Sequence, residues 1–422
     1  MTEPYTDIES ISKSIRAGKV SPLDVVNGCL ERIEALDPEL NAFITVMAEQ
    51  AREQAISAGA EIELGDWRGP LHGVPVGIKD FFDTAGTKTT AAYEHFKDRV
   101  PAKDAAIVAK LGEAGAVVIG KTNMHTMGMG TTGMESYYGP ALNPWDAGYI
   151  PGGSSSGSAV AVASGMCYAT VDTDAIGSCR LPAACCGVVG FKGTYGLIDA
   201  SGILDGEEGA DEMIMWLNHV GTTTRSVRDA ALLLDAVAER SGPMTPSYFD
   251  QTTNTDGTLR VGVGENFGAT PEVMAGFEAA VEVIKGLGCT VSEAIIPFGD
   301  PSGGLDAIEE DRKAIAGLAF GDFDVLILPT IPTAVPRVRD ASGNPQALSP
   351  EFTIFANYYG LPTVSVPCGF DADGLPIGLQ IAAGPWDEVS VLDLASRYQG
   401  ATPWHTEHPG VQSEDREQGL RK

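Results

Sequence analysis

The stretch Pro151-Gly152-Gly153-Ser154-Ser155-Ser156-Gly157-Ser158-Ala159 sets three consecutive serines between glycines and leads into an apolar run at residues 159–163. The serine run is too polar and too flexible for a core element, whereas the apolar run predicts a buried helix. A glycine-rich loop that leads into a helix points free backbone N–H groups at whatever lies above the helix N-terminus. We therefore expect a site for developing negative charge here, with a flexible loop or linker as the alternative.

Two further stretches carry side chains that need a joint explanation. Downstream, Asp172-Thr173-Asp174-Ala175-Ile176-Gly177-Ser178-Cys179-Arg180 places Ser178 directly after a glycine. Upstream, Val74-Pro75-Val76-Gly77-Ile78 reads as a buried strand that ends in Lys79. A serine hydroxyl is a poor nucleophile until a base takes its proton, and Ser-Lys pairs are one known solution. Taken alone, Lys79 has a plainer interpretation as a strand-end lysine that reaches solvent.

Three segments in this order resemble the amidase signature family: GVPVGIKD at 73–80, PGGSSSGSA at 151–159 and DTDAIGSCRLPAACCGVVGFKGTYG at 172–196. Members of that family hydrolyse or transfer amides with a Ser-Ser-Lys triad. Connecting pieces at 115–123, 143–145 and 374–380 are similar too, and the resemblance extends from about residue 5 to residue 400. It implies a hydrolase that acts on carbon–nitrogen bonds of linear amides.

The resemblance implies a role for each matching residue. Ser178 would be the nucleophile, Ser154 the bridging serine after a cis peptide bond, and Lys79 the neutral terminal base. The apolar run before Lys79 favours the neutral amine, because desolvation disfavours the charged form. Supporting hydroxyls and a structural ion pair behind the nucleophile loop would come from four more residues: Ser155, Thr173, Asp174 and Arg180.

The implied oxyanion hole departs from the family, which usually has Thr-Gly-Gly-Ser at these positions. Because glycine adopts backbone angles that a β-branched residue avoids, either Ile176 has an ordinary negative φ or the loop is strained, and we expect the former. The isoleucine side chain would then project near the acyl pocket. The backbone donors to the oxyanion would be those of Ala175, Ile176, Gly177 and Ser178.

The substrate is only weakly indicated. Segments that face the acyl pocket in relatives are apolar or aromatic here, which favours an apolar or aromatic acyl group on a small-molecule amide. Ordinary core packing is the alternative for each of these side chains. The candidates for substrate contact are Met129, Gly130, Trp216 and Tyr358.

The secondary-structure pattern alternates between strands and helices. This alternation favours an α/β fold with a mostly parallel sheet and helices on both faces, and the family's fold is a single large open mixed sheet. We expect one domain over residues 1–422, with a helical cover at 1–65, a core at 70–240 and the remaining sheet and pocket wall at 255–410. Strands are predicted at 74–79, 116–119, 167–171, 187–191, 260–263, 290–296, 325–328, 363–366 and 377–382. Helices are predicted from Thr6 and Ser21, at 104–111, 159–164, 226–240, 270–288 and 305–318, and from Asp387.

Charge and composition exclude several classes. The chain has 57 acidic and 28 basic residues, a formal net charge of −29, so we expect no nucleic acid partner. No apolar run is long enough to span a bilayer, and the first residues are acidic where a signal peptide is basic. We expect a cytoplasmic protein without a membrane partner. The seven cysteines and six histidines show no metal-ligand spacing, so we expect no metal and no cofactor.

Three functions stay open. The first is hydrolysis of a carboxylic amide, hydrazide or ester through an acyl-enzyme on Ser178. The second resembles the glutamine amidase component of the tRNA-dependent amidotransferase, which delivers ammonia to a partner. The third is a degenerate binding protein, suggested by Ile176.

A short region at 296–324 bears on the second function. Many relatives have a longer insertion there that helps wall the substrate entrance, and in the tRNA-dependent amidotransferase it supplies an arginine for the glutamine carboxylate. The short region therefore indicates a more open entrance and argues against a glutamine amidase. In the family the N-terminal helices sometimes make a dimer interface, so a homodimer is a further expectation.

Overall fold

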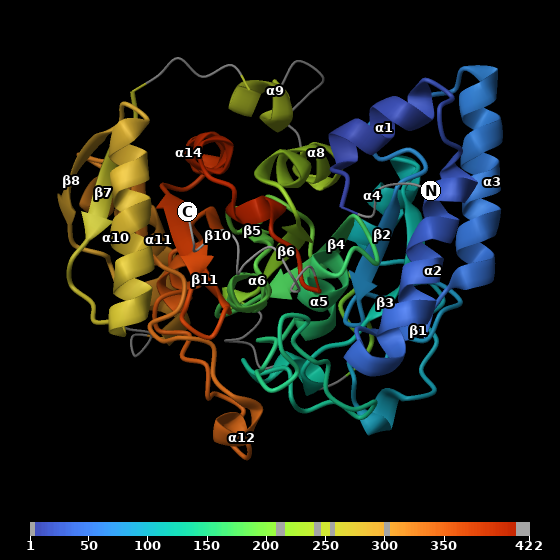
Figure 1. The fold of residues 1–422 in the computed structure, drawn as a ribbon, viewed down its shortest axis with the longest axis horizontal. Coiled ribbons are helices and arrows are strands. Elements are labelled where there is room, and N and C mark those ends of the chain that lie inside the picture. The colour runs from blue at the N-terminus through green and yellow to red at the C-terminus, as the bar shows by residue number, and fades with distance from the viewer. Residues whose placement is uncertain (1–4, 208–215, 240–245, 254–257, 299–303, 411–422) are drawn as a thin grey trace, which may run out of the picture.

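The computed structural model describes residues 5–207, 216–239, 246–253, 258–298 and 304–410. Within these ranges, one sheet of eleven strands runs through the whole molecule (Figure 1). In spatial order the strands are β1 (Phe43–Val46), β3 (Val117–Thr122), β2 (Pro75–Lys79), β4 (Ala169–Asp174), β6 (His219–Thr224), β5 (Val189–Lys192), β10 (Thr363–Phe370), β11 (Pro376–Ala383), β9 (Val325–Pro329), β7 (Arg260–Gly264) and β8 (Thr290–Ala294).

The sheet is mixed, as the family resemblance implies, but the expectation of a mostly parallel sheet is wrong. Parallel pairs join β2 to β3 and β4, and β7 to β8 and β9. The centre, from β4 through β6, β5, β10 and β11 to β9, is antiparallel throughout. Strand β6 accounts for part of the difference, because its threonine-rich sequence lacks apolar alternation and yet it lies between β4 and β5.

Helices cover both faces of the sheet. In Figure 1 α2 and α3 lie beside β1 at one end, and α10 lies beside β7 at the other. The helices are α1 (Ile8–Arg16), α2 (Pro22–Leu40), α3 (Ala48–Leu64), α4 (Ala106–Glu113), α5 (Ser156–Ala163), α6 (Arg180–Cys186), α8 (Val227–Val237), α9 (Tyr248–Thr253), α10 (Pro271–Gly286), α11 (Gly304–Ala319), α12 (Val338–Ala341), α13 (Ile354–Tyr358) and α14 (Glu388–Ala401). Single 3₁₀ turns lie at Glu94–Phe96, Thr126–Gly128 and Trp404–Thr406. No helix in the described ranges has the length and apolar character needed to cross a bilayer.

Helix starts follow the capping residues in the sequence. Ser21 and Asp24 form a reciprocal capping box at α2 with proline at its first position, and Ser226 caps α8. At α1 the cap is Asp7, whose side chain accepts from Ser10 N–H, and not Thr6 as predicted. Asp7 directly precedes the helix, one residue later than Thr6, and its carboxylate reaches the first turn.

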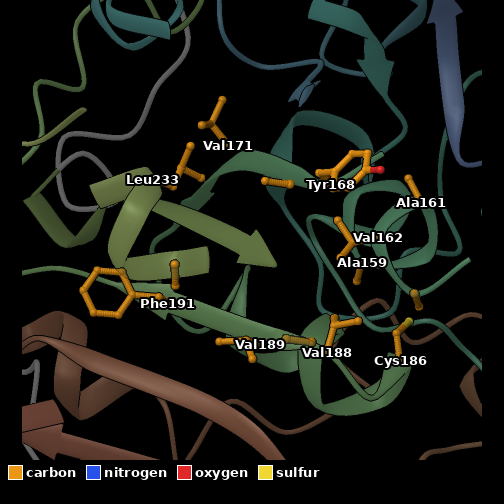
Figure 2. Packing of buried hydrophobic residues seen from close by; sticks show 14 of the residues in the cluster. Ala159, Ala161, Val162, Tyr168, Val171, Cys186, Val188, Val189, Phe191 and Leu233 are labelled. Atoms are coloured by element: carbon orange, nitrogen blue, oxygen red, sulfur yellow. The ribbon is translucent and has the colours of Figure 1, made fainter. Parts of the chain in front are cut away.

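The core places the serine-rich stretch rigidly. Helix α5 is buried on every side and packs against β2, β4 and α6, and its alanines and valines belong to the main hydrophobic core (Figure 2). Close packing of this kind leaves little freedom to the loop that precedes the helix. The helix starts at Ser156, three residues earlier than the apolar run predicted, so the last of the three serines belongs to its first turn.

Candidate active site

Two parallel neighbouring strands bring the predicted base to the nucleophile loop. Ile78 on β2 pairs in register with Val171 on β4, so the next residues, Lys79 at the end of β2 and Asp172 within β4, lie side by side. Strand β4 then leads through residues 175–179 into α6. Because carboxyl ends of parallel strands share one sheet edge, Lys79 and the loop that carries Ser178 meet there.

Lys79 is buried and held by two hydroxyls. Its Nζ lies 2.7 Å from Ser154 Oγ and 2.8 Å from Thr173 Oγ1. Burial lowers the pKa of Lys79 to about 8, against the opposing charges of Asp172 and Asp174. Within the described residues no carboxylate comes within ion-pair distance of the Lys79 amine. The neutral base that the resemblance implies is therefore accessible near neutral pH.

The serine stretch and the nucleophile loop are joined by backbone contacts. The peptide bond Gly153–Ser154 is cis, as the resemblance implies. The N–H of Ser155 donates to the carbonyl of Ser178 at 3.1 Å. Ser154 is 1% exposed and Ser178 is 5% exposed. The structure thus gathers Lys79, Ser154 and Ser178 in one buried site.

The predicted oxyanion hole loses one of its donors. The N–H of Gly177 donates to Asp174 Oδ1 at 2.7 Å, so this group is already engaged. In the part of the chain that is described, the N–H groups of Ala175, Ile176 and Ser178 donate to no other residue. Ile176 keeps a negative φ, as expected, and Gly177 takes the positive value of 128°. The loop therefore needs glycine at position 177 and tolerates isoleucine at 176.

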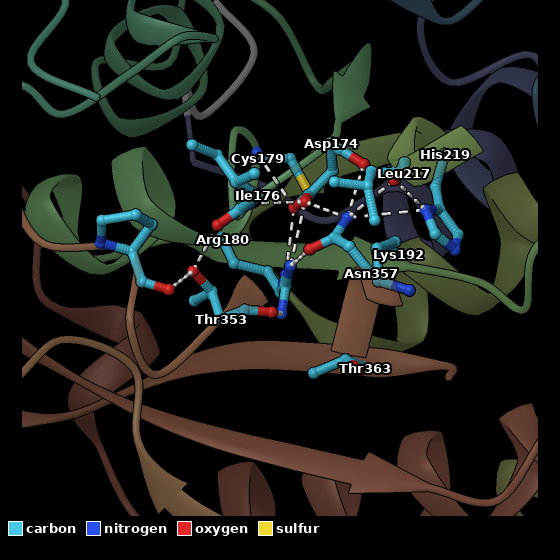
Figure 3. Close-up of polar contacts among 12 residues, drawn as sticks. Asp174, Ile176, Cys179, Arg180, Lys192, Leu217, His219, Thr353, Asn357 and Thr363 are labelled. Atoms are coloured by element: carbon cyan, nitrogen blue, oxygen red, sulfur yellow. Dashed lines mark hydrogen bonds and ion pairs between the residues drawn. The ribbon is translucent and has the colours of Figure 1, made fainter. Parts of the chain in front are cut away.

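A buried ion pair lies behind the nucleophile loop. Arg180 donates to both carboxylate oxygens of Asp174, at 3.0 and 2.9 Å, and neither side chain is exposed (Figure 3). Burial opposes ionisation of Asp174, but the arginine and the other donors hold its pKa well below the usual range. An ion pair this deep is worth little net stability and instead fixes geometry. The predicted structural pairing of these two residues agrees with these contacts.

Sequence reasoning missed the distant residues that complete this network. Gln380 Oε1 accepts from Arg180 Nη1 at 2.7 Å, and Asn357 Oδ1 accepts from Nη2 at 2.5 Å. Thr353 gives its backbone carbonyl to Arg180 and its hydroxyl to the carbonyl of Ile176. All three are buried polar residues in apolar segments, which is the one signal that could have singled them out.

Asp172 was also missed. Its side chain is fully buried, with Oδ2 accepting from Thr170 and Thr223 hydroxyls at 2.8 Å each. Burial raises the pKa of Asp172, while the nearby Lys79 lowers it. A second ionisable group therefore shares the buried space with the base.

The structure separates the four candidates for substrate contact. A side chain at Gly130 would collide with the His125 ring, so this position leaves no room for one. Met129 is 56% exposed. Tyr358 is buried and packs in one apolar cluster with Ile176, next to the nucleophile loop. Trp216 stacks on Tyr195 and lines a cavity of about 770 Å³ whose described lining includes none of the three triad residues.

The wall next to Ser154 comes from a different segment. Gly128 has φ 71° and lies near Ser154 Oγ, with Phe81 beside it. Phe81 and Met127 pack on a small cluster that contains Ala91, and the Lys79 amine lies 5.8 Å from the Phe81 ring centroid. An apolar wall of this kind keeps water from the lysine.

This fold and this arrangement of a buried lysine with two serines define an amidase signature protein. The chain belongs to the amidase family, whose sequence profile matches residues 24–300 and 306–392.

Individual relatives agree with this assignment. The chain is similar to the A subunit of the glutamyl-tRNA(Gln) amidotransferase from Geobacter metallireducens, with 33% identity over 96% of this chain and 99% of the relative. Among solved structures it is similar to 6-aminohexanoate cyclic dimer hydrolase in complex with substrate, with a TM-score of 0.85, 28% identity and coverage of 98% and 100%. It is also similar to the peptide amidase of Stenotrophomonas maltophilia, with a TM-score of 0.82, 25% identity and coverage of 97% and 99%.

Proposed function

We propose that this protein hydrolyses a small carboxylic amide, hydrazide or ester through an acyl-enzyme on Ser178. The observation that carries the proposal is the buried Lys79 amine, 2.7 Å from Ser154 Oγ and with a pKa lowered to about 8. A buried lysine with a pKa lowered to about 8 gives up its proton more readily than an exposed lysine, which suits it to act as a base.

The proposed reaction moves one proton through Ser154. Ser178 Oγ attacks the substrate carbonyl carbon as its proton passes to Ser154, and the Ser154 proton passes to Lys79 Nζ. The return of a proton by the same route to the leaving nitrogen breaks the carbon–nitrogen bond and leaves an ester on Ser178. A water activated by the same residues then hydrolyses this ester.

The tetrahedral intermediate needs donors for its negative oxygen. The unengaged N–H groups of Ala175, Ile176 and Ser178 are suited to this role, and each such donor is typically worth about 10²–10³ in rate. The Gly177 N–H is committed to Asp174 and takes no part.

A serine-directed phosphonate tests the nucleophile. The wild-type protein should gain the mass of one adduct, which peptide mapping places on Ser178, and the Ser178→Ala variant should gain none. An adduct on another serine contradicts the assignment. No adduct and no turnover on a panel of amides, hydrazides and esters would favour the non-catalytic binding protein instead.

Glutamine hydrolysis for a partner is the second candidate. It is favoured by the 33% identity to the A subunit of a glutamyl-tRNA(Gln) amidotransferase. Among the described residues between β8 and β9, α11 is the only helix, and this short connection supports a free-standing hydrolase instead. Ammonia release from glutamine, compared with release from the amide panel, separates the two candidates.

A further inference from the structure

The peptide unit between Ile176 and Gly177 is held at both ends (Figure 3). Its carbonyl oxygen accepts from Thr353 Oγ1 at 2.5 Å, and its N–H donates to Asp174 Oδ1 at 2.7 Å. Because a trans peptide points its C=O and N–H in opposite directions, these two bonds fix the plane of the unit. The residues that hold it come from β4 and from the segment before α13.

The next peptide unit is fixed by the helix that follows. The carbonyl of Gly177 accepts from Leu181 N–H at 2.7 Å, in the first turn of α6. The N–H of Ser178 belongs to the same unit and so points away from that helix. The contact to Leu181 therefore directs the free Ser178 N–H, and the contact from Thr353 to the Ile176 carbonyl, the first anchor, fixes the peptide before it. The free Ala175 N–H shares its peptide with the Asp174 carbonyl, which accepts from Asn357 Nδ2 at 2.7 Å.

Gly177 makes the hydrogen bond from Thr353 to the Ile176 carbonyl necessary. Gly177 has φ 128°, where residues with side chains are rarely found, and an added Cβ would collide with Thr353 and Leu181. A glycine at this point permits rotation of the peptide before it at little cost. If the Ile176 carbonyl turned into the site, an acceptor would face the oxyanion and repel it.

We propose that Thr353 is the positioning residue of the oxyanion loop, whose hydroxyl keeps the Ile176 carbonyl out of the site. The inference rests on the proposed function, since an oxyanion forms only if Ser178 attacks a carbonyl. Thr353 is fully buried and its own carbonyl accepts from Arg180 Nη1 at 3.0 Å, so its position is fixed by the ion pair network. The Thr353 hydroxyl also lies 3.0 Å from the carbonyl oxygen of Pro350. It has one proton to donate, and the carbonyl oxygen of Ile176 is the nearer of the two acceptors.

Three variants isolate the hydroxyl. Thr353→Val keeps the shape and removes the hydrogen bond, while Thr353→Ser keeps the hydrogen bond. Thr363→Val is the matched control, because Thr363 is equally buried and also bonds a backbone carbonyl, that of Leu361, away from the loop. If Thr353→Val does not fold, Thr353→Ala removes the same hydroxyl without a branched side chain.

The variants are compared on an amide that the wild type hydrolyses and on phenylboronic acid, which forms a tetrahedral adduct with an active serine. Thr353→Val should lower kcat about 10- to 100-fold and leave KM within about threefold, because the lost interaction acts only in the transition state. Phenylboronate affinity should fall by the same factor. Thr353→Ser should restore both, and Thr363→Val should change neither.

Unchanged kcat and boronate affinity in Thr353→Val would overturn the proposal, and so would an equal loss in Thr363→Val. A crystal structure of Thr353→Val decides the matter even for an inactive protein. We expect the Ile176–Gly177 peptide to be turned or to take two orientations, and one unchanged orientation would refute the proposed role. A wild type that neither turns over substrate nor reacts with the phosphonate would defeat the proposed function, while this structure would still test the anchor.

Discussion

Lys79 at the end of β2 lies beside Asp172 on the neighbouring parallel strand β4, and neither side chain is exposed to solvent. The carboxylate is the strongest of the charges that oppose the effect of burial on the pKa of Lys79. Further ionisable groups near this amine are Asp174 at the end of β4, Cys179 before α6 and His125 after β3. The base and its nearest acid therefore titrate as interacting groups.

The first prediction concerns pH. Lys79 must be neutral to accept a proton, and burial lowers its pKa from 10.5 to about 8. The protonated form dominates below that value, so kcat/KM should rise with pH through about 8 and level off above it. This rising limb is measured by a pH profile of kcat/KM on a substrate that does not itself ionise in this range. A rate that is flat between pH 6 and 9 would contradict a lysine base.

Asp172→Asn is the second prediction. Because Asp172 raises the pKa of Lys79, its removal should lower that pKa and move the limb to lower pH. Asp229→Asn is the control, since Asp229 is an equally buried aspartate on α8. An unmoved limb in Asp172→Asn would mean that Asp172 is already neutral in the working enzyme.

The third prediction tests the proton route. Lys79→Ala and Ser154→Ala should each lower kcat on the order of 10³-fold or more, and the double variant should be little worse than the worse single variant. If the two residues pass on the same proton, removing either one already interrupts the transfer, so removing the second costs little more. Ser156→Ala is the control, because Ser156 is buried in the same run and its hydroxyl has no partner among the described residues. Multiplying effects in the double variant would rule out the relay.

The fourth prediction concerns acyl selectivity. Ile176 packs with Leu217, Ile308 and Tyr358 next to the nucleophile loop. Ile176→Gly should admit bulkier acyl groups and should change the ratio of kcat/KM between a branched and a short acyl amide more than the rate on the best small substrate. Ile308→Ala, in the same cluster, controls for general loosening. Equal changes for both substrates would show that Ile176 acts through the oxyanion loop instead.

The fifth prediction follows from the net charge of −29. Surface carboxylates repel one another, and the screening length falls from about 10 Å at 0.1 M salt to about 3 Å at 1 M. The Tm should therefore rise with moderate sodium chloride. The rise should shrink at pH 4.5, where part of the carboxylates are neutral. A flat curve at neutral pH would mean that the acidic residues are locally compensated.

Much of the site's frame could be predicted because it lies in short, strongly patterned stretches. The apolar run before Lys79 forms β2 and ends at that residue, as predicted. The start of α10 after Thr270 and that of α14 after Asp387 match their capping and proline signals. These features depend on neighbours in the sequence.

The rest depends on contacts between distant residues. Arg180 bonds Gln380, 200 positions away, and no local pattern marks either residue as a partner of the other. The commitment of the Gly177 N–H to Asp174 is likewise a matter of loop conformation, which residue type alone does not specify. Strand β6 was missed because its burial comes from its place between two other strands and not from an apolar pattern of its own.

The reach of the Arg180 network has a consequence for synthesis on the ribosome. Lys79, Ser154 and Ser178 all emerge early, yet Thr353, Asn357 and Gln380, which brace the nucleophile loop, are made in the last quarter of the chain. A nascent polypeptide that ends before Thr353 would carry the whole triad without its brace. Hydrolytic competence would then appear late in translation, as a single event, and a truncated product would be inert.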